Sequence, residues 1–191
     1  MSQLSLFGAM AREPALADVE GLLAGNGQVV RRADAARISV VVAEDWRVRA
    51  LVDEMRSALG LEAEVGPAEV GMTVGTPWLG ELRATADAWF RGAVKCPPAG
   101  WVLDGSRLRW WCLSAGRSAG DMYSLALGAN DEHGWLAVGS ALSAVGVPGV
   151  LVGPRADGPA YRIVGRRRLA RLVELIGDRP DGVPTEAWPQ A

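Results

Sequence analysis

An internal repeat constrains the fold of this chain more than any other feature of its sequence. Five residues recur after a constant 86 positions: Ala43, Asp45, Ser57, Ala58 and Gly60 match Ala129, Asp131, Ser143, Ala144 and Gly146. The pattern around each copy predicts a helix, two strands, a helix, two strands and a helix. One α–β unit of this size buries only one face of its sheet, so two units must pack together. We therefore predict an α+β fold of two pseudo-symmetric α-β-β-α-β-β-α repeats with antiparallel sheets.

The boundaries of these elements follow from hydrophobic periodicity and from helix and turn signals. Helices are predicted over 15–25, 46–59, 77–94, 131–145 and 166–176. Thr76 would cap the third of these helices, which either runs through to Val94 or breaks once. Strands are predicted over 28–31, 37–42, 61–65, 70–74, 101–103, 107–114, 122–128, 149–152 and 160–164. The chain then divides into an N-terminal arm (1–13), a first repeat (14–83), a second repeat (84–177) and a loose tail (178–191).

Composition excludes several classes of protein. The 191 residues are 49% hydrophobic, which is enough for a packed core. Two cysteines and one histidine exclude a disulfide-stapled scaffold and an ordinary zinc site, and they argue against a histidine-based catalytic triad. No apolar run is long enough to span a bilayer, and no signal peptide is recognisable. We expect a cytoplasmic monomer with no membrane contact.

Basic residues are unevenly distributed along the chain. Residues 83–171 carry 12 basic and 6 acidic side chains, whereas residues 1–82 carry 7 basic and 12 acidic ones. This bias is typical of a surface that contacts phosphates, and it is equally typical of a solvated, arginine-rich face. Composition alone leaves both interpretations open.

Two nine-residue segments suggest a family. Val19–Gly27 and Phe90–Pro98 each resemble the motif that opens a repeat of the LAGLIDADG homing endonucleases, and the resemblance extends over residues 15–176. Phe90–Ala93 also resembles the degenerate domain of the WhiA sporulation regulators. Gly21 and Gly92 occupy the third motif position. The resemblance implies that their helices approach closely at a pseudo-two-fold interface.

The resemblance also implies a loss of catalysis. In the active family, an acidic residue at the eighth motif position of each repeat holds divalent metal. Those positions are Asn26 and Pro97 in this chain, and neither supplies the anionic ligand that a hard cation requires. We therefore expect a non-catalytic relative without cofactor or metal. The alternative is a divergent, metal-dependent nuclease that uses Asp18 or Glu20.

The family reads duplex DNA with its strands, which directs attention to arginines on predicted strands and turns. Arg107 and Arg109 alternate on the strand predicted over 107–114, so both would face outward. One of the adjacent residues Trp110 and Trp111 would then be buried and the other partly exposed. Arginines that rim a sheet without any ligand are the alternative interpretation. The predicted DNA-contacting set is Arg31, Arg32, Arg37, Arg107, Arg109, Arg117, Arg162, Arg166 and Arg167.

The N-terminal arm contains the most specific short motif. Gln3, Leu4, Ser5, Leu6 and Phe7 resemble the pentapeptide that binds the bacterial sliding clamp, the beta subunit of DNA polymerase III. Leu6 and Phe7 would anchor in an apolar pocket, although the same side chains could instead dock on the domain. We expect a clamp-recruited, DNA-binding accessory protein of replication or repair. A transcriptional regulator or adaptor of the WhiA type is a further alternative.

Overall fold

The computed structural model describes residues 13–156 and 158–190. Its helical segments are η2 (Leu16–Val19), α1 (Glu20–Ala24), α2 (Asp45–Leu59), α3 (Leu82–Trp89), α4 (Gly105–Ala115), α5 (Glu132–Ala144), η3 (Pro154–Ala156), α6 (Arg166–Ile176) and η4 (Thr185–Ala187). Its strands are β1 (Gln28–Arg31), β2 (Ala36–Val42), β3 (Glu64–Pro67), β4 (Met72–Gly75), β5 (Phe90–Arg91), β6 (Val94–Lys95), β7 (Gly116–Ala119), β8 (Met122–Ala126), β9 (Val150–Val152) and β10 (Ala160–Val164).

Two four-stranded antiparallel sheets have the same strand order. The first runs β1-β2-β4-β3 and the second runs β7-β8-β10-β9, so every strand has a counterpart in the other sheet. Helices α1 and α4 precede the two sheets, and α2 and α5 occupy equivalent places between the second and third strands. The predicted fold of two pseudo-symmetric repeats with antiparallel sheets is therefore confirmed.

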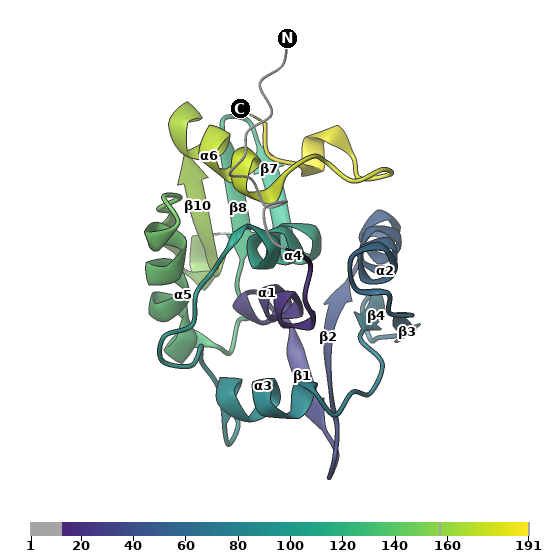
Figure 1. Ribbon diagram of the computed structural model, residues 1–191. Coiled ribbons are helices and arrows are strands. Elements are labelled where there is room, and N and C mark those ends of the chain that lie inside the picture. Colours follow the sequence, from purple (N-terminus) through teal and green to yellow (C-terminus); the bar gives the residue numbers. More distant parts are fainter. Residues whose placement is uncertain (1–12, 157, 191) are drawn as a thin grey trace.

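The two opening helices form the centre of the molecule. Helices α1 and α4 pack against each other, and Figure 1 shows them in the middle of the view, with β1 and β2 below them and β7, β8 and β10 above. Leu22, Leu23, Trp110 and Trp111 from these helices are almost completely buried. Helix α1 has only five residues, so its stability depends on this packing rather than on its own propensity.

The main error of the sequence-based prediction lies between residues 90 and 115. Segment 107–114, predicted as a strand, belongs to helix α4, and both Trp110 and Trp111 are buried instead of only one. Phe90–Lys95, predicted as the end of a helix, forms the short hairpin β5–β6. Gly92 lies in its turn with a φ of 65°, a left-handed conformation that favours glycine.

Helix α3 also begins later than predicted. Thr76 does not cap a helix, because its buried Oγ1 accepts a hydrogen bond from Ile38 N on β2 (3.2 Å). The helix starts at Leu82 and packs against β1 and β2. It therefore crosses the predicted boundary between residues 83 and 84. The division into a first repeat (14–83) and a second repeat (84–177) stays a prediction.

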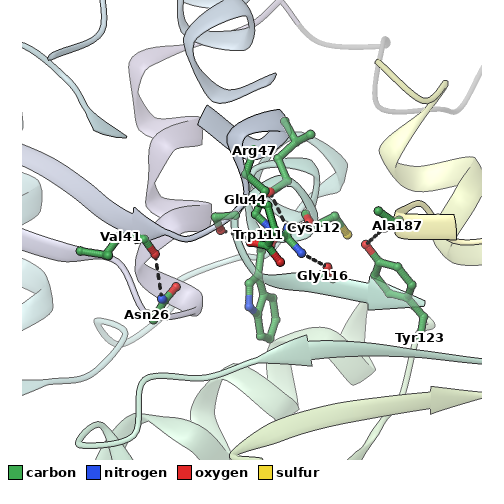
Figure 2. Close-up of polar contacts among 11 residues, drawn as sticks. Asn26, Val41, Glu44, Arg47, Trp111, Cys112, Gly116, Tyr123 and Ala187 are labelled. Atoms are coloured by element: carbon green, nitrogen blue, oxygen red, sulfur yellow. Dashed lines mark hydrogen bonds and ion pairs between the residues drawn. The ribbon is translucent and has the colours of Figure 1, made fainter. Parts of the chain in front are cut away.

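The C-terminal segment was predicted to be loose, but it packs on the second repeat. Val183 and Trp188 are buried in the core, and η4 contacts β7. Tyr123 Oη on β8 donates a hydrogen bond to Ala187 O (3.3 Å), as Figure 2 shows. Apolar side chains between the prolines therefore hold this segment in place. Among the described residues, no helix is long and apolar enough to cross a membrane.

Candidate nucleic-acid interface

Each sheet has one face under the helices and one open face. On β2, the side chains of Ile38, Val40 and Val42 are buried, whereas Val41 between them is 41% exposed. On β8, Tyr123 and Leu125 are buried and the intervening Ser124 is partly exposed. Because side chains alternate along a strand, these patterns define which residues line each open face.

Two arginines lie in one row on the open face of the second sheet. Arg117 on β7 and Arg162 on β10 both lie opposite Ser124 on β8, so the three form one row across the sheet. Arg117 is exposed and Arg162 partly so. No acidic residue occurs in β7, β8, β9 or β10. The backbones of Arg117 and Arg162 are therefore separated by two inter-strand spacings, about 10 Å.

Two further exposed arginines lie at the start of α6, next to the end of β10. Val164 pairs with Met122, which places the following residues beside the β7–β8 turn. Arg166 and Arg167 begin α6 and are exposed. Positive side chains at a helix N-terminus oppose the helix dipole, and an anion bound there would offset the repulsion.

The first sheet is less basic. Arg37 on β2 forms an ion pair with Glu64 on β3 at 2.7 Å, and the pair reaches across the position of Gly75 on the intervening strand. Arg31 belongs to the covered side, because it lies opposite buried Ala36, donates to Ala86 O (2.8 Å) and pairs with Asp87 (3.4 Å). These contacts neutralise or occupy two of the predicted arginines.

An aromatic side chain marks the end of the first sheet. The guanidinium of Arg32 lies 3.8 Å from the ring centroid of Trp78, and that of Arg37 lies 5.5 Å away. Such stacking holds a guanidinium in one orientation while leaving its N–H groups able to donate. Arg32 is exposed, so it remains accessible from solvent.

Arg107 and Arg109 do not belong to an open sheet, and their predicted strand placement is wrong. Arg107 on α4 contacts Glu20 Oε2 (3.1 Å) and Asp104 Oδ2 (2.8 Å). Arg109 forms two hydrogen bonds with Glu54, at 2.8 and 3.1 Å. Both side chains are at most 20% exposed. They join elements of the two repeats, which explains their positive charge without a ligand.

Close contact between the central helices depends on Gly21. A Cβ atom at this position would overlap Arg107 O and Trp110 Cβ. The predicted partner Gly92 lies on the β5–β6 hairpin, and a Cβ there would meet nothing within 4 Å. The predicted Gly21–Gly92 contact is therefore wrong. Gly21 on α1 instead makes room for Arg107 O and Trp110 Cβ on α4.

The carboxylates proposed as substitute metal ligands lie at the other end of α1 from Asn26. Glu20 accepts from Trp101 Nε1 (2.8 Å) as well as from Arg107. Asp18 is buried, and its Oδ2 accepts from Ala15 N (2.9 Å) at the start of η2. Both groups hold local structure. Among residues 13–156 and 158–190, no cluster of three His, Cys, Asp or Glu side chains could hold a metal ion.

The carboxyl end of α1 is covered by the only lysine in the sequence. Lys95 Nζ on β6 donates to Gly25 O (2.7 Å) and Gly27 O (2.9 Å), and it pairs with Asp131 Oδ2 (2.7 Å). Its side chain is 6% exposed. Burial lowers the pKa of Lys95, while the hydrogen bond and charge of Asp131 act in the opposite direction. Sequence analysis missed this role, although a single lysine among twenty basic residues was a visible signal.

The carboxyl end of α4 is covered in the same way. Arg47 on α2 donates to Leu113 O (2.8 Å) and Gly116 O (2.6 Å), and its Nε contacts Glu44 Oε2 (3.1 Å). Figure 2 shows this guanidinium directed at Gly116, with Glu44 and Cys112 beside it. Burial lowers the pKa of Arg47, and Glu44 partly compensates.

Comparison with known proteins gives one informative result. No protein-family model and no curated protein matches the chain. The structure of "the homing endonuclease I-WcaI bound to its DNA recognition sequence" superposes with a TM-score of 0.59 over 83% of this chain and 78% of that chain, at 8% identity. This chain has the LAGLIDADG homing-endonuclease fold. I-DmoI in complex with DNA and Mn gives a TM-score of 0.47 at 9% identity, covering 87% of this chain and 100% of that chain.

The second opening helix is α4, so the predicted motif Phe90–Pro98 does not open the second repeat, and its Pro97 is not at a helix end. Gly27 directly precedes β1 and Gly116 begins β7, and a Cβ at either glycine would overlap backbone or a neighbouring side chain. Asn26 follows the end of α1, and Ala115 is the last residue of α4. With cations already at both helix ends and no acid at either position, these residues do not fit a divalent metal.

The remaining predictions are not tested by these comparisons. The clamp-binding motif Gln3–Phe7 lies outside the described residues. The resemblance to WhiA regulators rested on Phe90–Ala93, which form part of the β5–β6 hairpin and its turn, and it stays a prediction.

Proposed function

We propose that this protein is a non-catalytic accessory protein that binds duplex DNA in the cytoplasm, in replication or repair. The observation that carries the proposal is the exposed Arg117 on an open antiparallel sheet, in one row with Ser124 and Arg162. A LAGLIDADG fold similar to that of a DNA-bound homing endonuclease supports the proposal. Basic side chains on such a surface contact phosphates, and the intervening serine can donate to or accept from a base edge.

Salt-dependent binding tests this assignment. Fluorescence anisotropy with a labelled 30-base-pair duplex should show affinity that falls steeply as salt rises, because bound arginines release counterions. Arg117→Ala should reduce the slope of log affinity against log salt by about 1. Arg49→Ala removes the same charge from the exposed side of α2 and should leave the slope unchanged. A salt-independent affinity, or equal effects of the two variants, would contradict DNA binding through the second sheet.

Recruitment by the sliding clamp is the second part of the proposal. The pentapeptide Gln3–Phe7 supports it, because Leu6 and Phe7 are adjacent apolar anchors and Gln3 can hydrogen-bond at a pocket rim. Tethering to the clamp raises the local concentration of a weakly binding domain near DNA. Leu6→Ala with Phe7→Ala should abolish co-elution with the clamp and leave the melting temperature unchanged. Unaltered co-elution would refute recruitment while leaving the DNA-binding result intact.

Two alternatives keep their own tests. A divergent nuclease would cleave DNA with magnesium and lose that cleavage on substitution of an acidic ligand. Asp18 and Glu20 are engaged in structural contacts, so the acid would have to lie elsewhere. A regulator or adaptor of the WhiA type would bind a protein partner without any dependence on the clamp. Pull-downs with and without residues 1–13 distinguish this adaptor from a clamp-recruited protein.

A further inference from the structure

The two ends of the central helices share an arrangement that neither the fold nor DNA binding explains. At each end, backbone carbonyls and one carboxylate surround a single buried cation; Arg47 also has Cys112 O at 3.5 Å. Lys95 lies among Gly25 O, Gly27 O and Asp131, at 2.7–2.9 Å. Lys95 is 6% exposed, and Arg47, the cation at the other helix end, is 5% exposed.

The second copy of the arrangement comes from different residues. Arg47 lies among Leu113 O, Gly116 O and Glu44, at 2.6–3.1 Å. Glu44 is the N-cap residue of α2, and Asp131 is the N-cap residue of α5, the equivalent helix. The two carboxylates therefore stand at the start of equivalent helices, although the internal repeat aligns Asp131 with Asp45 rather than with Glu44. The two bases do not occupy equivalent positions, since Arg47 comes from α2 and Lys95 from the hairpin β5–β6.

Each cation also lies beside a non-acidic residue at the carboxyl end of its central helix. Gly25 and Gly27 flank Asn26, and Gly116 follows Ala115 directly. The Asn26 side chain points away toward β2, where its Nδ2 lies 3.5 Å from Val41 O (Figure 2). Its Oδ1 is buried without a hydrogen-bond partner.

We propose that Lys95 and Arg47 are resident cations that replace divalent metal at the two helix ends, so that this protein neither binds nor needs a metal at its centre. The carbonyl oxygens at a helix C-terminus carry partial negative charge, and a cation there is favourable. A divalent ion would need several of the same oxygens at about 2.0–2.6 Å and would be repelled by the ammonium or guanidinium already present. This proposal concerns only the carboxyl ends of α1 and α4, and it does not depend on DNA binding.

Removing one resident cation should expose the site that it fills. In Lys95→Ala, the Gly25 and Gly27 carbonyls and the Asp131 carboxylate lose their cation and become ligands for Mn²⁺. The melting temperature of the full chain is measured from 0 to 5 mM MnCl₂ at constant ionic strength. A new site with a Kd of about 0.5 mM would raise the folding equilibrium constant roughly tenfold at 5 mM Mn²⁺. We expect that increase for Lys95→Ala and none for the wild-type protein.

The matched control is Arg56→Ala, which removes an exposed base from Glu62 without opening an enclosed site. It should respond to Mn²⁺ like the wild-type protein. A wild-type melting temperature that rises with Mn²⁺, or a Lys95→Ala variant that does not respond, would overturn the proposal. If Lys95→Ala does not fold, electron paramagnetic resonance of Mn²⁺ with the wild-type protein decides the question. The full signal of free Mn²⁺ is expected, and loss of one equivalent would overturn the proposal. Neither measurement contains DNA, so failure here is distinct from failure of the proposed function.

Discussion

Replacing Lys95 by Met should destabilise the protein strongly, because Met keeps the side-chain volume and removes the ammonium. Three oxygens then lose their partner: the Gly25 and Gly27 carbonyls and Asp131 Oδ2. Breaking a buried ion pair by removing one partner costs about 3–5 kcal/mol. The Asp131 side chain keeps 23% of its exposure, and burial lowers the pKa of Lys95. Both facts place the expected loss near the lower limit, about 3 kcal/mol.

Urea denaturation of the full chain measures this loss, and thermal unfolding checks it. For a protein of this size, a loss of about 3 kcal/mol corresponds to a fall of roughly 6–12 °C in melting temperature. Asp131→Asn in the same chain removes the stranded carboxylate. The double variant should therefore be more stable than the sum of the single effects predicts, by about 1–3 kcal/mol.

Two results would refute this reasoning. One is a Lys95→Met variant that loses less than about 1 kcal/mol, since that would mean water satisfies the three oxygens equally well. The other is simple additivity of Lys95→Met and Asp131→Asn. Arg56→Met serves as the control, because it breaks an exposed ion pair and should leave the urea midpoint unchanged.

Three more predictions follow from packing and titration. Gly21→Ala should cost about 1–3 kcal/mol in urea denaturation, because its Cβ overlaps the neighbouring helix, whereas Gly66→Ala meets open space and should cost far less. Trp188→Ala should cost about 3–5 kcal/mol and expose the surface beneath the C-terminal segment; an unchanged urea midpoint would show that this segment contributes nothing to stability. Burial raises the pKa of Cys112 to about 12, so a thiol reagent at pH 8 should label Cys96 and leave Cys112 unmodified in the folded protein. The unfolded Cys112 thiol ionises near 9, so its contribution to stability is present below pH 9 and is lost as pH rises toward 12; Cys112→Ala should remove that part of the alkaline decline.

Periodicity predicted the outer helices well. Leu169, Leu172, Leu175 and Ile176 recur at helical spacing, and α6 covers the predicted range 166–176. Helix α2 likewise ends where Gly60 adopts a φ of 64°. Both helices bury one face and expose the other, which is the condition under which hydrophobic periodicity is informative.

Helix α4 could not be identified in that way because it is buried on most of its surface. Leu108, Trp110, Trp111, Cys112 and Leu113 are all inaccessible, so the helix has no polar face. Its two partly exposed arginines lie two positions apart, which imitates the alternation of a strand. The one local signal of a helix was Asp104, whose carboxylate accepts from Arg107 N (2.9 Å) as an N-cap.

The candidate site could be predicted from the sequence only in part, because some of its contacts join residues that are far apart in the chain. Arg162 lies on a predicted strand, whereas β7, which carries Arg117, falls between the predicted strands 107–114 and 122–128. The register of β8 with both strands brings the two arginines into one row. The bases at the helix ends come from residues 65–70 positions away from the carbonyls that they contact. No local pattern encodes such contacts, because they depend on the mutual placement of the two repeats.

The contact between Gly21 and Trp110 has a consequence for ancestry. A duplicated gene begins with two identical halves, and either half could then pair with a second copy of itself. Two α1 helices would now face each other with a void between their glycines, and two α4 helices would meet at Trp110 without a glycine to make room for it. The halves have become complementary rather than interchangeable, so the fused chain can no longer be exchanged for a symmetric homodimer of either half.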